Sequence, residues 1–271
     1  MITSSEPPRF PEMQEALFRE VLCVLHRQRV PFAISGAFAL HQCTGIWRQT
    51  KDLDLFLKAE DAARALSALR GDGFECEVPD PVWLAKAHRG DFFVDLITGM
   101  SNAVITVDDS WIERAIPAAI LGLRTRVLAP EELLASKLFV TRRDRFDGAD
   151  IAHIIFRTGG NLDWDRLLQL VGEHWEVVLW ALLLFAYVYP AHAAFVPRRL
   201  WRDLLTRFQK GIENPDPNTP FRGSLIDENM FAIDVTEWGM ADLLTQLRAR
   251  REPKIHDCQP QSDAFDREAS P

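Results

Sequence analysis

The chain has 271 residues, of which 47% are hydrophobic and 26% are charged, and its formal net charge is −8. This length and composition suffice for one large globular unit or two small ones, and they exclude disorder, collagen and disulfide scaffolds. The acidic balance argues against wholesale electrostatic binding of duplex nucleic acid, although a local Arg-rich groove is compatible with it. The four cysteines lie far apart without a C-x-x-C pair, so we predict neither a zinc site nor a disulfide framework.

Two features bear on where the protein is found. Residues 1–11 are rich in Ser and Pro and lack the charged and apolar regions of a secretory signal. The longest uncharged apolar run, residues 177–189, has thirteen residues, which is short of the ~20 that a membrane-spanning helix needs. We therefore predict a cytoplasmic protein without a membrane partner, in which residues 177–189 form a buried core helix.

The first half of the chain alternates helix and strand patterns. Hydrophobic periodicity and Gly/Pro punctuation predict a mixed sheet with helices up to about residue 127. The predicted elements, in chain order, are a helix at 12–29, a strand at 32–35, a helix at 37–43, a strand at 51–57, a helix at 59–70, and strands at 74–78, 83–88 and 91–97.

The second half is predicted to be helical. Helical patterns occupy residues 131–142, 149–157, 164–172, 175–189 and 197–209. Residues 213–220 are a Pro-, Asn- and Asp-rich loop, and residues 221–242 carry no motif that predicts a function. The domain prediction is an α/β domain at 1–127, a helical domain at 128–251 and a disordered tail at 252–271.

A pair of carboxylates stands on the strand predicted at 51–57. Side chains two residues apart leave the same face, so Asp52 and Asp54 stand about 6.5 to 7 Å apart between Cα atoms, while Leu53 and Leu55 face the core. Such a pair repels itself unless a hard divalent cation lies between the oxygens, and Mg²⁺ with a triphosphate completing its shell fits this role. The pair predicts a metal site; the alternative is a solvated polar face on an edge strand.

A third carboxylate on a neighbouring strand is expected if two metals hold a phosphoryl centre. Asp95 lies among apolar neighbours in the strand predicted at 91–97, where an unpaired charge is costly. We predict that Asp95 shares the metal and takes a proton from an attacking hydroxyl as a general base. The alternative is a strand-end residue that caps the loop toward Thr98 and Gly99.

Gly36 marks a candidate phosphate site. It lies where the strand predicted at 32–35 leads into the helix predicted at 37–43, and a glycine there allows the backbone to approach a phosphate closely. The free N–H groups of a helix N-terminus bind anions. Together with the three carboxylates, Gly36 points to nucleotide chemistry.

These residues, in this order, resemble the nucleotidyltransferases of the DNA polymerase β-like superfamily, especially the small bacterial AbiEii-type and related toxin-like members. The resemblance covers about residues 32–155 and implies a mixed β-sheet core with flanking helices, followed by a helical domain. The matching motifs are a glycine at a strand-to-helix turn, an Arg-x-Thr, an acidic-hydrophobic-acidic strand and a later acid, here Gly36-Ala37 with Gly45, Arg48-Gln49-Thr50, Asp52-Leu53-Asp54 and Asp95.

By this resemblance, Lys137 contacts triphosphate oxygens, because AbiEii-like members carry a Lys on a later helix that is followed by an Arg and acids. Arg145, Asp147 and Asp150 follow here. The alternative is a surface lysine whose stem lies along an apolar helix face. The full nucleotide-binding set predicted from the resemblance consists of Gly36, Ala37, Arg48, Thr50 and Lys137.

Two details leave alternatives open. Ala37 stands where the family has Gly or Ser, so this position offers neither extra backbone freedom nor a hydroxyl for a phosphate. Arg48 either steers the triphosphate or pairs with Asp52 and Asp54. The arginines at 142, 143 and 145 alternate with acids, which is more typical of a solvated helix end than of a nucleic-acid patch.

The resemblance implies a Mg²⁺- or Mn²⁺-dependent enzyme that transfers a nucleoside monophosphate from an NTP to an acceptor hydroxyl on tRNA, protein or a small molecule. Such an enzyme could act as a toxin that is held inactive by an antitoxin protein. The alternative, motivated by Ala37, is an inactive nucleotide-binding or protein-interaction module. Binding of NTP without pyrophosphate release would distinguish the second from the first.

Overall fold

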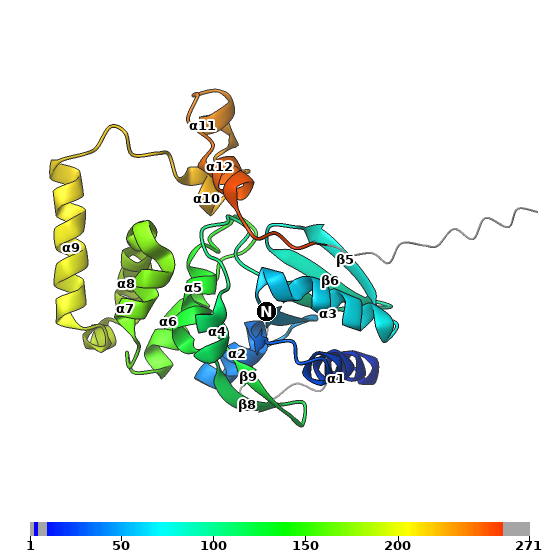
Figure 1. The fold of residues 1–271 in the computed structure, drawn as a ribbon. Helices are drawn as coiled ribbons and strands as arrows, with labels where there is room; N and C mark the ends of the chain where they lie inside the picture. The colour runs from blue at the N-terminus through cyan, green and yellow to red at the C-terminus, as the bar shows by residue number, and fades with distance from the viewer. Residues whose placement is uncertain (1–2, 5–9, 257–271) are drawn as a thin grey trace, which may run out of the picture.

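The computed structural model describes residues 3–4 and 10–256 and is built around one mixed seven-stranded sheet (Figure 1). The strand order is β5-β6-β7-β4-β2-β9-β8, and a separate two-stranded sheet pairs β1 with β3. The strands are β1 (Thr3–Ser4), β2 (Ala33–Ile34), β3 (Trp47–Arg48), β4 (Asp52–Phe56), β5 (Glu75–Asp80), β6 (Leu84–Arg89), β7 (Phe92–Ile97), β8 (Ile116–Ile120) and β9 (Leu123–Val127).

The sheet is mixed because β4 runs parallel to β7, and β2 runs parallel to β9, whereas the other neighbours are antiparallel. Both parallel pairs require crossover connections, which the helices between the strands supply. The inward side chains of β4, Leu53 and Leu55, are fully buried, as their alternation with Asp52 and Asp54 predicts. β4 is therefore a central strand with one buried face and one face that carries acids.

Helices pack around this sheet. The helix α1 (Glu12–Arg27) packs on α3 (Ala59–Gly71) and contacts β7, while α2 (Gly36–Thr44) contacts β4 and β9 and also the helices α5 and α6. The short helix α4 (Asp109–Glu113) buries Trp111, whose ring stacks on Phe56 with centroids 5.6 Å apart. The predicted fold class, a mixed β-sheet core with flanking helices that is followed by a helical region, is confirmed.

After β9 the chain is helical, as predicted. Figure 1 shows α9 at one edge of the molecule, whereas the segment that follows it returns over the sheet. The elements are α5 (Pro130–Leu138), α6 (Gly148–Arg157), α7 (Trp164–Val171), η1 (Gly172–His174), α8 (Trp175–Val188), η2 (Pro190–Phe195), α9 (Arg198–Glu213), α10 (Gly223–Ile226), α11 (Ala232–Thr236) and α12 (Leu243–Arg250).

The prediction that residues 177–189 form a buried core helix is wrong for half of α8. One face packs in the core through Val178, Leu182 and Phe185, but Trp180 is half exposed and Tyr187 is 85% exposed. Uniform hydrophobicity gives no hint of which face is buried, because periodicity marks a buried face only where polar residues alternate with apolar ones. By length and composition alone, the helical stretch Trp164–Val188 could cross a membrane, although its turn at η1 divides it into two helices.

Two further differences concern boundaries. The helix predicted at 131–142 ends at Leu138, because Thr141 bridges Phe146 and the amide of Asp147 donates to the Val140 carbonyl, which forms a tight loop instead. The β8–β9 hairpin was not predicted as separate strands. The domain limits at residues 127 and 251 stay predictions. Of the predicted tail, residues 257–271 lie outside the described residues, whereas Ile255 is buried and its amide donates to the Pro81 carbonyl.

Candidate active site

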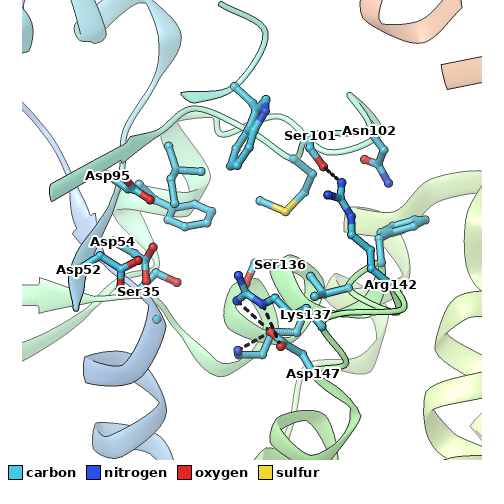
Figure 2. Close-up of a pocket in the computed structure, with 18 of the residues that line it drawn as sticks. Ser35, Asp52, Asp54, Asp95, Ser101, Asn102, Ser136, Lys137, Arg142 and Asp147 are labelled. Carbon is cyan, nitrogen blue, oxygen red and sulfur yellow. Dashed lines mark hydrogen bonds and ion pairs between the residues drawn. The ribbon is translucent and has the colours of Figure 1, made fainter. Parts of the chain in front are cut away.

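Three carboxylates converge at the centre of the sheet. The parallel pairing of β4 with β7 sets Asp54 directly opposite Asp95, and Asp52 lies on the same face two residues earlier. One carboxylate oxygen from each of the three residues lies within 4.8 Å of the others. Figure 2 shows them together on one wall of a cavity. Hard oxygen donors at this spacing match the ligands that Mg²⁺ and Mn²⁺ prefer.

The structure contradicts both alternative interpretations of these acids, the solvated edge strand and the strand-end cap. β4 has β7 on one side and β2 on the other, so Asp52 and Asp54 are not on an edge strand. Asp95 is the fourth residue of the six-residue strand β7 and so is not a strand-end cap. Two neighbouring strands in mid-sheet, β4 and β7, therefore hold three close carboxylates.

Two neighbours bind the outer members of this cluster. The Thr50 hydroxyl donates to Asp52 Oδ1 at 2.5 Å, which orients that carboxylate. Lys86 faces Asp95 across the antiparallel β6–β7 pair, and its Nζ donates to Asp95 Oδ1 at 2.5 Å while lying 4.1 Å from the centroid of the Phe93 ring. Within the described residues, the ion pair of Lys86 with Asp95 is the one ion pair that any of the three acids forms.

The burial and close approach of these acids shift the pKa values of Asp54 and Asp95. Burial, followed by the charges of Asp52 and Asp95, raises the pKa of Asp54 to about 7. Burial also raises the pKa of Asp95, although the hydrogen bond and charge of Lys86 oppose this shift. The charges of Lys137 and Arg145 lower the pKa of Asp54 but do not offset the other effects. One lysine is therefore too little positive charge for three acids, and the cluster favours an added cation.

Gly36 is required by the close approach of Asp54. Its φ is +57°, and a Cβ at this position would lie 1.8 Å from Asp54 Oδ2. The amide of the preceding residue, Ser35, donates to the Asp54 carbonyl at 2.9 Å, which fixes the turn against β4. Gly36 therefore holds the first turn of α2 against the carboxylate cluster, and no other residue type fits there without displacing Asp54.

Ser35 is a site residue that the sequence did not single out. It is the N-cap of α2, it is 3% exposed, and it lines the cavity beside Asp54 (Figure 2). Its hydroxyl forms no cap bond and has no hydrogen-bond partner among the described residues. The Ser35 hydroxyl and the free amides at the start of α2 are thus available to a ligand at this turn. Ala37 itself has no hydroxyl and does not line the cavity.

Lys137 lies at the site but is held by acids. It is 6% exposed, and its Nζ donates to Asp147 Oδ2 at 2.9 Å and to Asp150 Oδ2 at 2.8 Å. Arg48 pairs with the other oxygen of Asp150 at 2.5 Å, and Arg145 pairs with Asp147 at 3.2 Å. These five side chains form one ion-pair network beneath the cavity. The surface-lysine alternative for Lys137 is wrong, because its amino group is buried and paired.

The cavity has a volume of about 210 Å³ and two unlike walls. The acids of β4 and β7 form one wall, and Lys137 and Arg142 contribute cations to the other (Figure 2). Arg145 also lines the cavity. The side chain of Arg145 is 67% exposed, so a ligand could reach it. The mixed charge pattern of residues 142–145 gave no hint that Arg142 and Arg145 line a site.

The predicted site residues are therefore only partly brought together. Asp52, Asp54, Asp95, Gly36 and Lys137 line the cavity. The other three, all in the described part of the chain, lie behind the wall: Arg48 pairs with Asp150, Thr50 bonds Asp52, and Ala37 packs against the core. Their nucleotide-binding roles stay predictions, and for Arg48 and Thr50 the structure shows contacts with acids.

Comparison with known proteins places this chain in a family. A family model described as uncharacterised nucleotidyltransferase matches residues 32–188, which is more than half of the chain and includes every site residue predicted above. No curated protein sequence matches the chain.

Solved structures with a similar chain course are remote in sequence. The antibiotic-resistance factor ANT(2'')-Ia is 16% identical, with 63% of this chain and 95% of that chain covered and a TM-score of 0.46. The lincosamide antibiotic adenylyltransferase LnuA is 14% identical, with 54% and 98% covered and a TM-score of 0.37. An antigenic nucleotidyltransferase-like protein from Paracoccidioides brasiliensis is 18% identical, with 68% and 89% covered and a TM-score of 0.40.

No comparison tests the AbiEii-type subgroup, which stays a prediction. The match over residues 32–188 contains the strand-to-helix turn at Gly36, the acids of β4 and the acid of β7. The chain belongs to this family of nucleotidyltransferases.

Proposed function

We propose that the protein transfers a nucleoside monophosphate from an NTP to an acceptor hydroxyl, with a divalent metal ion as cofactor. The observation that carries this proposal is the cluster of Asp52, Asp54 and Asp95, whose oxygens lie within 4.8 Å of one another in the middle of the sheet. Burial and the charges of Asp52 and Asp95 raise the pKa of Asp54, so a structural role alone gives no reason to keep three acids together in mid-sheet.

The residues present fit Mg²⁺ or Mn²⁺. All three candidate ligands are carboxylates that share one face and line the cavity, and among the described residues only Asp95 has an ion pair, with Lys86. Asp52, Asp54 and Asp95 would hold the ion. When bound, the ion neutralises charge on the triphosphate oxygens and on the departing pyrophosphate.

The reaction needs a proton acceptor at the attacking hydroxyl, and we assign this role to Asp95. The acceptor oxygen loses its proton to Asp95 and forms a bond to the α-phosphorus, while the bond from that phosphorus to the β-phosphate oxygen breaks and pyrophosphate leaves. Lys86, which donates to Asp95 Oδ1, opposes the rise that burial causes in the pKa of this carboxyl and so favours its ionised form. The second oxygen of Asp95 remains available to the cluster.

The opposite wall provides for the triphosphate. Arg145 is exposed to the cavity and Lys137 lies beneath it, so phosphate oxygens between the walls would meet a cation on the side away from the acids. The Ser35 hydroxyl and the first amides of α2 offer hydrogen-bond donors at the acidic wall. Catalysis in this arrangement consists of positioning and electrostatic stabilisation.

The test is transfer of label from each α-³²P-NTP into a cell extract, with Mg²⁺, with Mn²⁺ and with EDTA. We expect metal-dependent label that Asp54→Asn abolishes and that a matched exchange at a distant exposed site, Asp165→Asn, leaves intact. Turnover retained in Asp54→Asn would refute the mechanism. Binding of NTP without label in any fraction would indicate the inactive nucleotide-binding module instead.

The physiological part of the proposal is that the enzyme is a toxin in the cytoplasm and that a separate antitoxin protein inhibits its transfer activity. This rests on the resemblance to toxin-like members and on no contact in the structure. Growth arrest on expression, relieved by Asp54→Asn, would support it. Normal growth of cells that contain the active enzyme would contradict it.

A further inference from the structure

The C-terminal segment, residues 223–256, docks on the sheet domain rather than on the helices that precede it. Arg248 donates to Asp80 Oδ2 at 2.7 Å and to the Ser101 carbonyl at 2.6 Å. Arg251, at 6% exposure, donates to the Thr98 carbonyl at 3.1 Å. Because the partners lie about 150 residues earlier in the chain, these bonds define a specific position of the segment against the loop that follows β7.

The front of this segment, α10, reaches the active site. The Asn102 amide donates to the Leu225 carbonyl at 3.1 Å, and Asp227 accepts from the Arg143 amide at 3.2 Å. Leu225 is buried and lines the cavity that contains the three acids. The wall of the active site is therefore completed by a residue, Leu225, outside the stretch that matches the family, which ends at residue 188.

Docking of the segment creates a second cavity, of about 260 Å³, beside the first. The two cavities share Trp83, Ser101, Asn102, Arg142 and Leu225. Figure 2 shows Arg142 reaching to Ser101 on the side of the cavity away from Asp52, and its guanidinium donates to the Ser101 hydroxyl at 3.0 Å. Arg142 and Ser101, which form this bond, line both cavities, so the two cavities are adjacent at this pair.

The second cavity has the chemistry of a polar binding site. Asp80, Ser224, Glu228 and Arg248 line it together with the shared polar residues, and the segment itself contributes Ser224, Glu228 and Arg248. Most ligand cavities are mainly apolar with a few polar groups, so this lining favours a ligand that is itself hydroxylated or charged. Its volume is below the range of about 300 to 1,000 Å³ that encloses drug-sized ligands, and it suits a small molecule.

We propose that this second cavity is the acceptor site, and that the acceptor is a small, polar, hydroxyl-bearing molecule rather than RNA or protein. The inference rests on the proposed nucleotidyl transfer. With the triphosphate between the acids and the cationic wall, the acceptor hydroxyl enters from the end of the cavity formed by Trp83, Asn102 and Leu225. The C-terminal segment thereby selects the acceptor, while the family-matched part binds the nucleotide.

The experiment separates acceptor binding from nucleotide binding in the full-length chain. Ile226→Trp fills the second cavity, since Ile226 lines only that one, and Ile233→Trp is the matched control on the same segment in neither cavity. Glu228→Gln changes the lining at an exposed position and so is a second variant without a packing change. The probes are Mg-ATP, for binding, and the ultrafiltrate and the retained RNA and protein of a cell extract, for transfer of ³²P.

We expect the wild type and Ile233→Trp to label compounds in the ultrafiltrate. Labelling should fall by about tenfold or more in Ile226→Trp and by less in Glu228→Gln. The affinity for Mg-ATP should agree within about twofold among all four proteins. Label confined to RNA or protein would overturn the proposal. Undiminished labelling by Ile226→Trp would also overturn it. Absence of label from both fractions with Mg-ATP still bound contradicts the acceptor assignment. Failure of the wild type to bind Mg-ATP or any of the other three Mg-NTPs contradicts the proposed function and with it the acceptor site.

Discussion

Replacing Asp54 by Asn should stabilise the metal-free protein at alkaline pH while it abolishes transfer. Asn has nearly the shape of Asp, so it fits against Gly36 without the charge that burial and the neighbouring acids oppose. In the wild type, the folded state holds the Asp54 proton more tightly than the unfolded chain does, because its pKa rises from 3.8 to about 7. The wild type therefore loses stability as pH rises between these values.

The size of this effect follows from the pH window. Between pH 5 and pH 7, folding keeps a proton on Asp54 that the unfolded chain has released, and each unit of pH corresponds to about 1.4 kcal/mol. The upper value for the stability lost by the wild type is thus about 3 kcal/mol between pH 5 and pH 8. Because the carboxyl is only half-buried and opens onto the cavity, we expect about 1 to 3 kcal/mol.

The assay is urea denaturation in EDTA at pH 5 and pH 8, for the wild type, Asp54→Asn and the distant control Asp165→Asn. The advantage of Asp54→Asn over the wild type should be larger at pH 8 than at pH 5 by the amount above, and saturating Mg²⁺ should reduce or reverse it, since the ion stabilises the wild-type cluster. An advantage that is equal at both pH values, or equally large in Asp165→Asn, would refute the reasoning.

Three further outcomes follow from single contacts. Gly36→Ala, which forces a Cβ onto the Asp54 carboxylate at a φ of +57°, should lower the free energy of unfolding by about 1 to 3 kcal/mol and abolish labelling; normal values of both in urea denaturation and transfer assays contradict this. Lys86→Met removes the cation that opposes the raised pKa of Asp95, so the acidic limb of the kcat/KM profile should move to higher pH, and an unmoved limb contradicts the assignment of Asp95 as the base. Asp150→Asn leaves two buried cations short of a partner and should cost about 3 to 5 kcal/mol in urea denaturation, where a loss below about 1 kcal/mol would show that the network is dispensable.

Local patterns were sufficient to predict the acidic wall of the site. The alternation Asp52-Leu53-Asp54 sets two acids on one strand face whatever the partner strands are, and a glycine between a strand and a helix marks a tight turn. Asp95 could be predicted because a charge among six mostly apolar strand residues requires a reason. The structure adds the register, in which Asp95 faces Asp54 across a parallel pair.

The cationic wall could not be predicted in the same way, because it depends on pairings between distant residues. Whether Lys137 is free or paired is decided by Asp147 and Asp150, ten and thirteen positions away on the next loop and helix. Lys86 reaches Asp95 only through the antiparallel register of β6 with β7. The contribution of Leu225 depends on a bond to Asn102 that spans 123 positions, which no local pattern encodes.

The distribution of positive charge argues that the acidic cluster is kept for a ligand. Neither Lys137 nor Arg48 pairs with the three acids: the fold pairs both cations with Asp150, and it supplies Asp147 as a further partner for Lys137. The cations at the site are thus neutralised by acids of their own, while Asp52 and Asp54 have no ion pair among the described residues. A fold under selection for stability alone would pair these charges with each other. Keeping them apart leaves a negative site that a divalent cation can complete, and an exposed Arg145 opposite it for the phosphates that such a cation brings.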